Sequence, residues 1–190
     1  MLDLGTGDGR FVLATAAARP DLLVIGVDAD SAALAEASRR AARPARRGGL
    51  PNAQFVAAAA EALPAELDGL ASALTLHFPW GSLLRGLLGA EPQLLAGIAR
   101  VTRPGAAVTL LLSVTARDHI AGTDAFDGDA VADLARQYAA WGLMLTEGRP
   151  ATPADVAASH STWAKRLGAG ERRPAWLLCL RRIEAPAPLR

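Results

Sequence analysis

The sequence predicts an α/β fold: a doubly wound, Rossmann-like sheet of seven strands that is mostly parallel, with an antiparallel last strand. Apolar runs of strand length alternate with helical stretches along the chain, which is the pattern of βαβ units and a parallel sheet. The first strand runs directly into a glycine-rich turn and a helix. A length of 190 residues suits one domain with a single core.

The elements follow in order from these patterns. A short apolar run forms the first strand, and a helix begins where the glycines end. The apolar run Leu22 to Val27 is the second strand, and Asp30 or Ser31 then caps the next helix. The pair Pro104-Gly105 predicts a sharp turn before the fifth strand. Strands are expected at 1–5, 22–28, 53–58, 71–77, 105–115, 142–147 and 175–183, the last two as an antiparallel hairpin. Helices are expected near 9–19, 31–43, 60–63, 82–101 and 127–141. Residues 1–184 form one domain, and the Ala/Pro-rich tail 185–190 is expected to be disordered.

The glycine-rich turn predicts the ligand. Glycines at 5, 7 and 9 allow positive φ and a close approach of the backbone to a ligand, and the following helix N-terminus offers unpaired N–H groups. The spacing is G-x-G-x-G, not the G-x-G-x-x-G that holds a dinucleotide pyrophosphate. Asp3 and Asp8 beside the turn would repel an anion but suit an ammonium or sulfonium. The pattern therefore favours S-adenosylmethionine (SAM) over an ordinary tight strand–helix turn.

Asp28 supports the same ligand. It ends the second strand about twenty residues beyond the glycines, where nucleotide-binding α/β folds place the acid that binds a ribose. One carboxylate accepts hydrogen bonds from both ribose hydroxyls. A capping role for Asp30 or Ser31 is compatible with that function.

Two tryptophans are candidates for binding a flat ring. Trp80 follows the fourth strand between Pro79 and Gly81, at the edge of the sheet where ligands bind, although core packing is the alternative. Trp163 lies in a polar segment before the last strand. Two loop tryptophans over one pocket suit an extruded base, because enzymes that act on a base remove it from its stack. Trp141 and Trp176 are expected in the core.

Charge and composition set further limits. The net charge is +1, but arginines gather at 39–47 and basic residues gather again near the C-terminal end, where they suit phosphates or simply a solvated surface. No apolar run is long enough to cross a membrane, and no signal peptide is expected because the chain opens on the ligand-binding strand. Cys179, in an apolar run, is expected to be a buried thiol of a cytoplasmic protein. The scattered histidines predict no metal site.

Three runs carry a more specific resemblance: Arg46-Arg47-Gly48-Gly49-Leu50-Pro51-Asn52, Phe78-Pro79-Trp80-Gly81-Ser82-Leu83-Leu84-Arg85-Gly86 and Ser161-Thr162-Trp163-Ala164-Lys165-Arg166-Leu167. They resemble the Kam-type aminoglycoside-resistance methyltransferases, which are SAM-dependent enzymes that modify N1 of adenine 1408 in 16S rRNA of the 30S subunit. The resemblance extends from Leu2 to about Arg182.

The resemblance implies a role for each matching position. The implied cofactor site comprises Asp3, Gly5, Thr6, Gly7, Gly9, Asp28, Ala29, Ala60, Glu61, His77, Phe78, Pro79, Trp80, Ser82, Ser161 and Thr162. Trp80 and Trp163 would stack on the flipped adenine. The residues expected to meet rRNA are Arg39, Arg40, Arg43, Arg46, Arg47, Lys165, Arg166, Arg172 and Arg173.

The implied reaction needs positioning more than acid–base chemistry, because adenine N1 carries a free lone pair at neutral pH. The family has an N-terminal β-hairpin for which this chain has no residues. The segment 116–127 also diverges and is expected to cover the pocket, and the protein is expected to be a monomer. Two alternatives stay open: a weakly active SAM-binding relative that docks on rRNA, and a small-molecule methyltransferase of the same fold.

Overall fold

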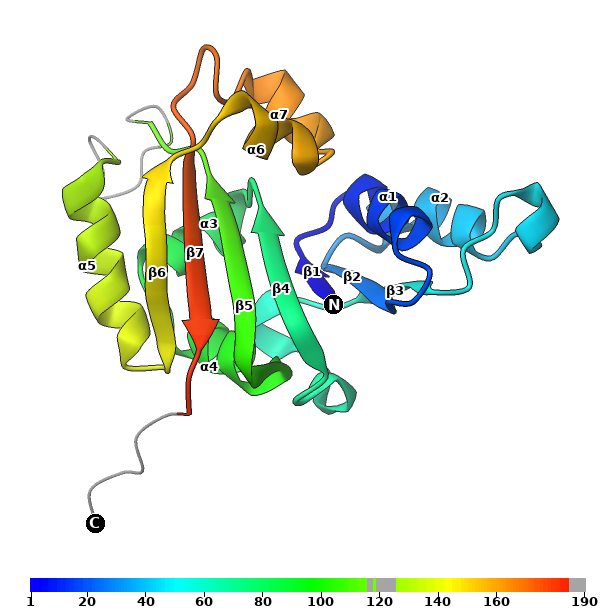
Figure 1. Cartoon of the computed structure of the whole chain (residues 1–190), viewed down its shortest axis with the longest axis horizontal. Helices are drawn as coiled ribbons and strands as arrows, with labels where there is room; N and C mark the ends of the chain where they lie inside the picture. Colours follow the sequence, from blue (N-terminus) through cyan, green and yellow to red (C-terminus); the bar gives the residue numbers. More distant parts are fainter. Residues whose placement is uncertain (116–117, 119–125, 185–190) are drawn as a thin grey trace.

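The computed structural model describes residues 1–115, 118 and 126–184, which fold around a seven-stranded sheet of order β3-β2-β1-β4-β5-β7-β6 (Figure 1). The strands are β1 (Leu2–Leu4), β2 (Val24–Asp28), β3 (Ala53–Ala57), β4 (Ala71–His77), β5 (Thr102–Leu112), β6 (Leu143–Pro150) and β7 (Trp176–Arg182). The pairings of β7 with β5 and β6 are antiparallel, and the other pairings of these strands are parallel. The predicted fold class is therefore confirmed.

The helices depart from prediction in two places. They are α1 (Arg10–Ala18), α2 (Ser31–Ala41), α3 (Gly81–Leu88), α4 (Pro92–Val101), α5 (Gly128–Ala139), α6 (Pro153–Ala158) and α7 (Thr162–Leu167), with short 3₁₀ turns η1 (Ala45–Arg47), η2 (Ala60–Ala62) and η3 (Ala65–Leu67). The single helix expected at 82–101 is wrong: Gly89 closes α3 and Pro92 opens α4, because proline fits only the first turn of a helix. Helices α6 and α7, which were not predicted, lie between β6 and β7 in the sequence. These two strands pair antiparallel as expected, but no short turn joins them.

Strand alternation divides the core between the two faces of the sheet. In β5, Leu110 and Leu112 face the large core formed with α3, α4 and α5, whereas Leu111 faces a smaller cluster with α6 and α7. In β2, Val27 faces the large core and Val24 packs against α1 and α2. Successive side chains of a strand point to opposite faces, so helices cover both sides, as in a doubly wound fold.

The fifth strand begins earlier than expected. Residues Pro104 and Gly105 lie inside β5, where the pairing with β4 jumps from Ala71–Thr102 to Ala73–Ala107. Gly105 has a φ of 82°, which glycine adopts without strain. The predicted sharp turn is therefore a bulge inside β5, which contains the extra residues, and not a turn that precedes the strand.

The remaining expectations concern Cys179, two tryptophans, the C-terminal tail and the segment 116–127. Cys179 is only half-buried in β7, so the expected buried thiol is wrong, because the covering cluster of α6 and α7 is small. Trp141 and Trp176 pack against the large core, as predicted. The tail 185–190 and most of the expected cover 116–127 lie outside the described residues. No helix among the described residues is long and apolar enough to cross a membrane.

The strand order places a crevice in the middle of the sheet. From β1 the chain moves outward through β2 and β3, and from β4 it moves outward in the other direction through β5. Ligands of open α/β sheets bind at such a switch point, beyond the carboxyl ends of the strands. The glycine turn after β1 and the Pro-Trp segment after β4 therefore both border this crevice.

Candidate functional site

A cavity of about 630 Å³ occupies this crevice, within the range usual for small-molecule and cofactor sites. The residues around it come from the glycine turn, the end of β2, the η2 turn, the segment after β4 and the start of α7. The tertiary structure thus brings together segments from both ends of the chain. Of the cofactor residues implied by the sequence, all but Gly9 line the cavity.

Gly9 has a packing role instead. It precedes α1 with a φ of 69°, and a Cβ placed there would lie 2.6 Å from Phe55 and 2.7 Å from Ala37. The third glycine of the motif therefore allows α1 to start tightly against α2 and β3. Gly5 and Gly7 also have positive φ, and they line the cavity directly.

Asp28 is held in place by the backbone around it. Its Oδ2 accepts a hydrogen bond from the Gly7 N–H at 2.8 Å, and its Oδ1 accepts one from the Asp30 N–H at 2.9 Å. Each carboxylate oxygen retains a further lone pair for a ligand hydroxyl. Asp30, not Ser31, caps α2 by accepting from the N–H groups of Ala32 and Ala33, so the capping role and a ligand role fall on different residues.

Asp3 lies at the buried base of the cavity. Its carboxylate is almost fully shielded from solvent and accepts a hydrogen bond from the Thr75 hydroxyl at 2.7 Å. Burial, as the main cause, raises the pKa of Asp3 to about 6. At neutral pH the cavity therefore carries a carboxylate with few solvent contacts, which favours a cationic ligand group.

His77 stands next to Asp3. Its Nδ1 is 3.9 Å from the Asp3 Oδ1, and the ring of Phe11 packs edge-on against its imidazole at 4.4 Å. Burial is the main cause that lowers the pKa of His77 to about 4, so the ring is neutral at physiological pH. A neutral imidazole offers one donor and one acceptor to its surroundings.

The cavity contains unpaired polar atoms. Among the residues that the structure describes, three buried side-chain atoms have no hydrogen-bond partner: Thr6 Oγ1, His77 Nδ1 and Trp163 Nε1. All three residues line this cavity. Because buried polar groups are nearly always hydrogen-bonded, their gathering at one place indicates a site whose bonds are completed by a polar ligand.

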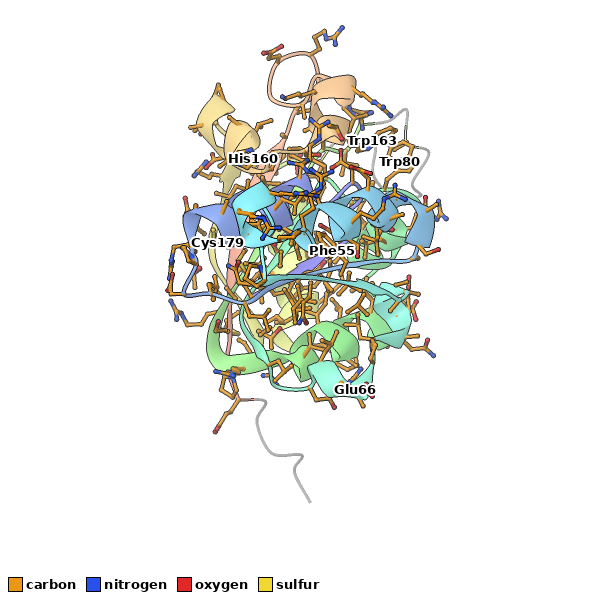
Figure 2. All side chains as sticks on the ribbon, turned by 90° about the vertical axis from the view of Figure 1, so that its right-hand side faces the viewer. Phe55, Glu66, Trp80, His160, Trp163 and Cys179 are labelled. Atoms are coloured by element: carbon orange, nitrogen blue, oxygen red, sulfur yellow. The ribbon has the colours of Figure 1, made fainter. Side chains whose placement is uncertain are left out.

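Trp80 and Trp163 stand together at the mouth of the cavity (Figure 2). Their ring centroids are 5.3 Å apart with an angle of 62° between the planes. Trp80 is 51% exposed, which excludes the core-packing alternative. Trp163 lies in the first turn of α7, not in a loop as expected. At this separation the two indoles are already in edge contact, so no base stands between them in this conformation.

Known proteins match this chain over nearly its whole length. The family model for NpmA, 16S rRNA (adenine(1408)-N(1))-methyltransferase, matches residues 1–181. A protein of that name from Streptoalloteichus hindustanus is 38% identical over 181 residues, which cover 91% of this chain and 82% of the relative. The chain belongs to the 16S rRNA (adenine(1408)-N(1))-methyltransferase family.

Solved structures of the family share the fold over nearly the full chain. The 16S rRNA methyltransferase KamB superimposes with a TM-score of 0.86 and 36% identity, covering 97% of this chain and 87% of KamB. A mutant of the Catenulisporales acidiphilia enzyme with cosubstrate SAM gives a TM-score of 0.87 at 31% identity, covering 99% of this chain and 87% of that one. The protein is thus a SAM-dependent methyltransferase by family and fold.

The basic residues implied for the interface of such a methyltransferase fall into two exposed groups. The first group, at the end of α2 and around η1, consists of Arg39, Arg40, Arg43, Arg46 and Arg47. Glu36 pairs with Arg39 at 3.0 Å and lies 4.0 Å from Arg43. The second group, at and after α7, consists of Lys165, Arg166 and Arg172. Arg166 also lines the cavity.

Arg173 differs from the other members of the implied interface. Its guanidinium donates to Asp118 Oδ2 at 2.5 Å and also to the Ser113 hydroxyl and carbonyl. Its side chain is 17% exposed and that of Asp118 is 2% exposed. A largely shielded arginine whose Nε and Nη2 already have partners is poorly available to a phosphate, so we leave Arg173 out of the proposed interface.

Several cavity residues were not predicted from the sequence, and Phe11, Ser159 and His160 are examples. Phe11 lines the cavity from the first turn of α1, and Ser159 and His160 line it from the turn between α6 and α7. A first-turn residue behind a glycine-rich loop must pass close to the ligand, so Phe11 had a detectable signal. Ser159 and His160 belong to no motif, and only the packing of α6 and α7 over the sheet brings them to the site.

Proposed function

We propose that this methyltransferase transfers the methyl group of SAM to N1 of adenine 1408 in the 16S rRNA of the 30S subunit. The observation that carries the proposal is the joining of two sites in one cavity. The glycine turn, Asp3 and Asp28 form a cofactor site, and the Trp80–Trp163 pair lies at its mouth. Membership of a family named for this reaction supports the choice of base.

The residues of the cavity fit SAM. The Asp3 carboxylate faces the ammonium of the methionine part, beside the backbone of Gly5 and Gly7. Asp28, oriented by two backbone N–H groups, accepts hydrogen bonds from the ribose hydroxyls. Ala60 and Glu61 in η2 border the adenine. The unpaired atoms of Thr6 and His77 supply further polar contacts.

The reaction follows from the positions of these groups. SAM supplies an electrophilic methyl carbon on a sulfonium. The N1 lone pair of adenine forms the new bond as the carbon–sulfur bond breaks, and the electron pair of that bond stays on sulfur. N1 carries no proton at neutral pH, so no residue acts as a base before attack. Trp80 and Trp163 align the base, and their ring faces stabilise the positive charge of the product.

The tryptophan pair must rearrange for the base to enter. The edge contact at 5.3 Å leaves no room for a ring between the indoles. We propose that the flipped adenine replaces this contact, one indole turning to stack on each face.

We also propose how the protein binds rRNA, where it acts and what its methylation causes. The two exposed basic groups bind rRNA phosphates on either side of the cavity, and the protein acts as a cytoplasmic monomer without a metal. The relative NpmB1, which is 34% identical over 96% of this chain with a TM-score of 0.78, is named an aminoglycoside resistance methyltransferase. We propose that methylation by this chain has the same consequence.

The deciding experiment is methyl transfer from labelled SAM to purified 30S subunits, mapped by primer extension. A methyl group on N1 blocks the Watson–Crick edge, so reverse transcriptase stops there. A single strong stop at adenine 1408 is expected, as with KamB run in parallel on the same subunits. If KamB produces the stop and this protein binds SAM but does not, the proposed substrate is wrong.

A further inference from the structure

A hydrogen bond joins the glycine turn to the helix that carries Trp163. The Thr162 hydroxyl in α7 donates to the Asp8 Oδ2 at 2.9 Å, across 154 positions of sequence. Asp8 lies between Gly7 and Gly9, whose φ values of 56° and 69° fix the shape of the turn. The direction of the Asp8 side chain is therefore set by the cofactor loop itself.

A helix cap and apolar packing also hold α7. The helix has six residues, too few to be stable alone. Ser161 caps it by accepting from the Ala164 N–H, and Ala164 packs into the small cluster with Phe78, against which Trp163 and Leu167 also pack. Trp163, directly after Thr162, has an indole N–H without a partner in the described structure. The bond to Asp8 is thus the polar attachment beside the indole.

We propose that Asp8 is a positioning residue, which acts through Thr162 to hold Trp163 at the mouth of the cavity. The inference rests on the proposed function, since Trp163 is there to receive the target base. It changes the role of Thr162: its hydroxyl proton is engaged by Asp8, so Thr162 connects two segments rather than donating to the cofactor. The loop that holds the methionine part of SAM and the indole that holds the base then move as one unit.

The reason for such a connection is geometric. In-line transfer requires N1, the methyl carbon and sulfur to be aligned, and a misplacement of about 1 Å can cost about a hundredfold in rate. The two partners of the reaction are held by segments from opposite ends of the chain. A direct bond between those segments fixes the base relative to the methyl group more tightly than two separate attachments to the sheet.

The test compares Thr162→Val with Thr162→Ser in the full chain. Thr162→Val keeps the side-chain volume and removes the hydroxyl, so kcat on 30S subunits at saturating SAM is expected to fall at least about tenfold. The SAM Kd stays within about threefold, because no cofactor contact is lost. Thr162→Ser keeps a donor and restores most of the rate. A parallel loss of SAM affinity and rate in Thr162→Val would show Thr162 to be a cofactor ligand and overturn the proposal.

A spectroscopic measurement separates positioning from general damage. The Trp80–Trp163 contact is expected to give a near-ultraviolet circular dichroism signal, which its loss in Trp163→Phe would identify. Thr162→Val is expected to lose that signal, and so is Asp8→Ala. The matched control is Arg10→Gln: Arg10 Nε, 3.2 Å from Asp8 Oδ2, pairs with the same carboxylate as Thr162, but Arg10 does not line the cavity. Loss of the signal in Arg10→Gln, or its survival in Thr162→Val, would refute the positioning role.

This design also distinguishes failure of the proposed function. If the unmodified protein leaves adenine 1408 unmethylated, the assignment of the substrate fails. The circular dichroism comparison still reports whether Asp8 and Thr162 hold the indole pair, and that comparison alone then decides the positioning proposal.

Discussion

Single residues of the cavity derive their chemistry from burial. Asp3 has a raised pKa in the folded protein, so between about pH 4 and pH 6 the folded state binds more protons than the unfolded state. The contribution of Asp3 to the stability of the free protein therefore falls as the pH rises through that window. A cationic ligand group reverses the preference, because it favours the ionised carboxylate.

We therefore expect SAM affinity to depend on pH through Asp3. Below about pH 6 the free protein must release a proton to bind the ammonium, so the Kd should rise about fivefold between pH 6 and pH 5. Isothermal titration calorimetry in buffers of different ionisation enthalpy measures both the affinity and the released proton. Asp3→Asn should bind weakly with a flat profile. His160→Gln, a change at the other side of the same cavity, should keep the slope, and a flat profile in that variant would assign the effect to His160.

The tryptophans give a second prediction at this scale. Trp80→Ala and Trp163→Ala should each lower methyl transfer to 30S subunits by about a hundredfold or more, because the base loses one stacking face. SAM affinity should stay within about threefold in both variants. Trp141→Ala serves as a control for a tryptophan that packs against the core: it should lower the melting temperature rather than the rate of the folded enzyme. Loss of SAM binding in Trp163→Ala would mean that its role is misassigned.

At the scale of elements, a buried ion pair joins the segment after β5 to the turn before β7. Arg173 donates to Asp118 and to Ser113, and Asp118 also accepts from the backbone and hydroxyl of Thr115. Both segments lie near the mouth of the cavity, since Asp118 lines a small hollow beside Trp80. The pair fixes where these elements leave the sheet.

Replacing the neighbouring arginines Arg172 and Arg173 should therefore change different properties of the protein. Arg173→Met leaves the Asp118 carboxylate buried without its cation, so the free energy of unfolding should fall by about 3 kcal/mol. Arg172→Met, at an exposed position, should leave stability within about 0.5 kcal/mol but weaken binding to 30S subunits. Urea titration and filter binding measure the two quantities. Equal stability in the two variants would contradict the structural role given to Arg173.

At the scale of the whole molecule, the charge distribution matters more than the net charge of +1. The exposed arginines of α2 and η1 and the basic residues of α7 come from distant parts of the sequence. Figure 1 shows α2 beside β2 and β3, and α7 above the ends of β4 and β5. The two groups are therefore expected to meet different parts of an extended polyanion.

The salt dependence of binding should report this surface. Replacing Arg46 and Arg47 together by alanine should reduce the slope of log K against log salt by about 2 for 30S subunits, one unit for each lost phosphate contact. SAM affinity should not change, because neither residue lines the cavity. Arg136→Ala on α5, outside both basic groups, should leave the slope unaltered. An unchanged slope in the double variant would remove this group from the interface.

The fold class, the cofactor loop and the candidate aromatic residues could be predicted from the sequence. These rest on local signals: strand alternation, glycines that allow positive φ, and an acid at a fixed distance along the chain. The same signals missed the break at Gly89–Pro92 and the two helices between β6 and β7. Helix propensity over the long apolar stretch 82–101 predicts one helix, but Gly89 and Pro92 divide it into two.

The different roles of neighbouring residues of the same type became visible only in the folded structure. Nothing local distinguishes Arg172 from Arg173, or the packing glycine Gly9 from Gly7, whose backbone lines the cavity. The bond between Asp8 and Thr162 joins positions 154 residues apart, and no periodicity encodes such a pair. Burial and partners are properties of the folded arrangement, because they depend on which segments the sheet order brings to the same edge.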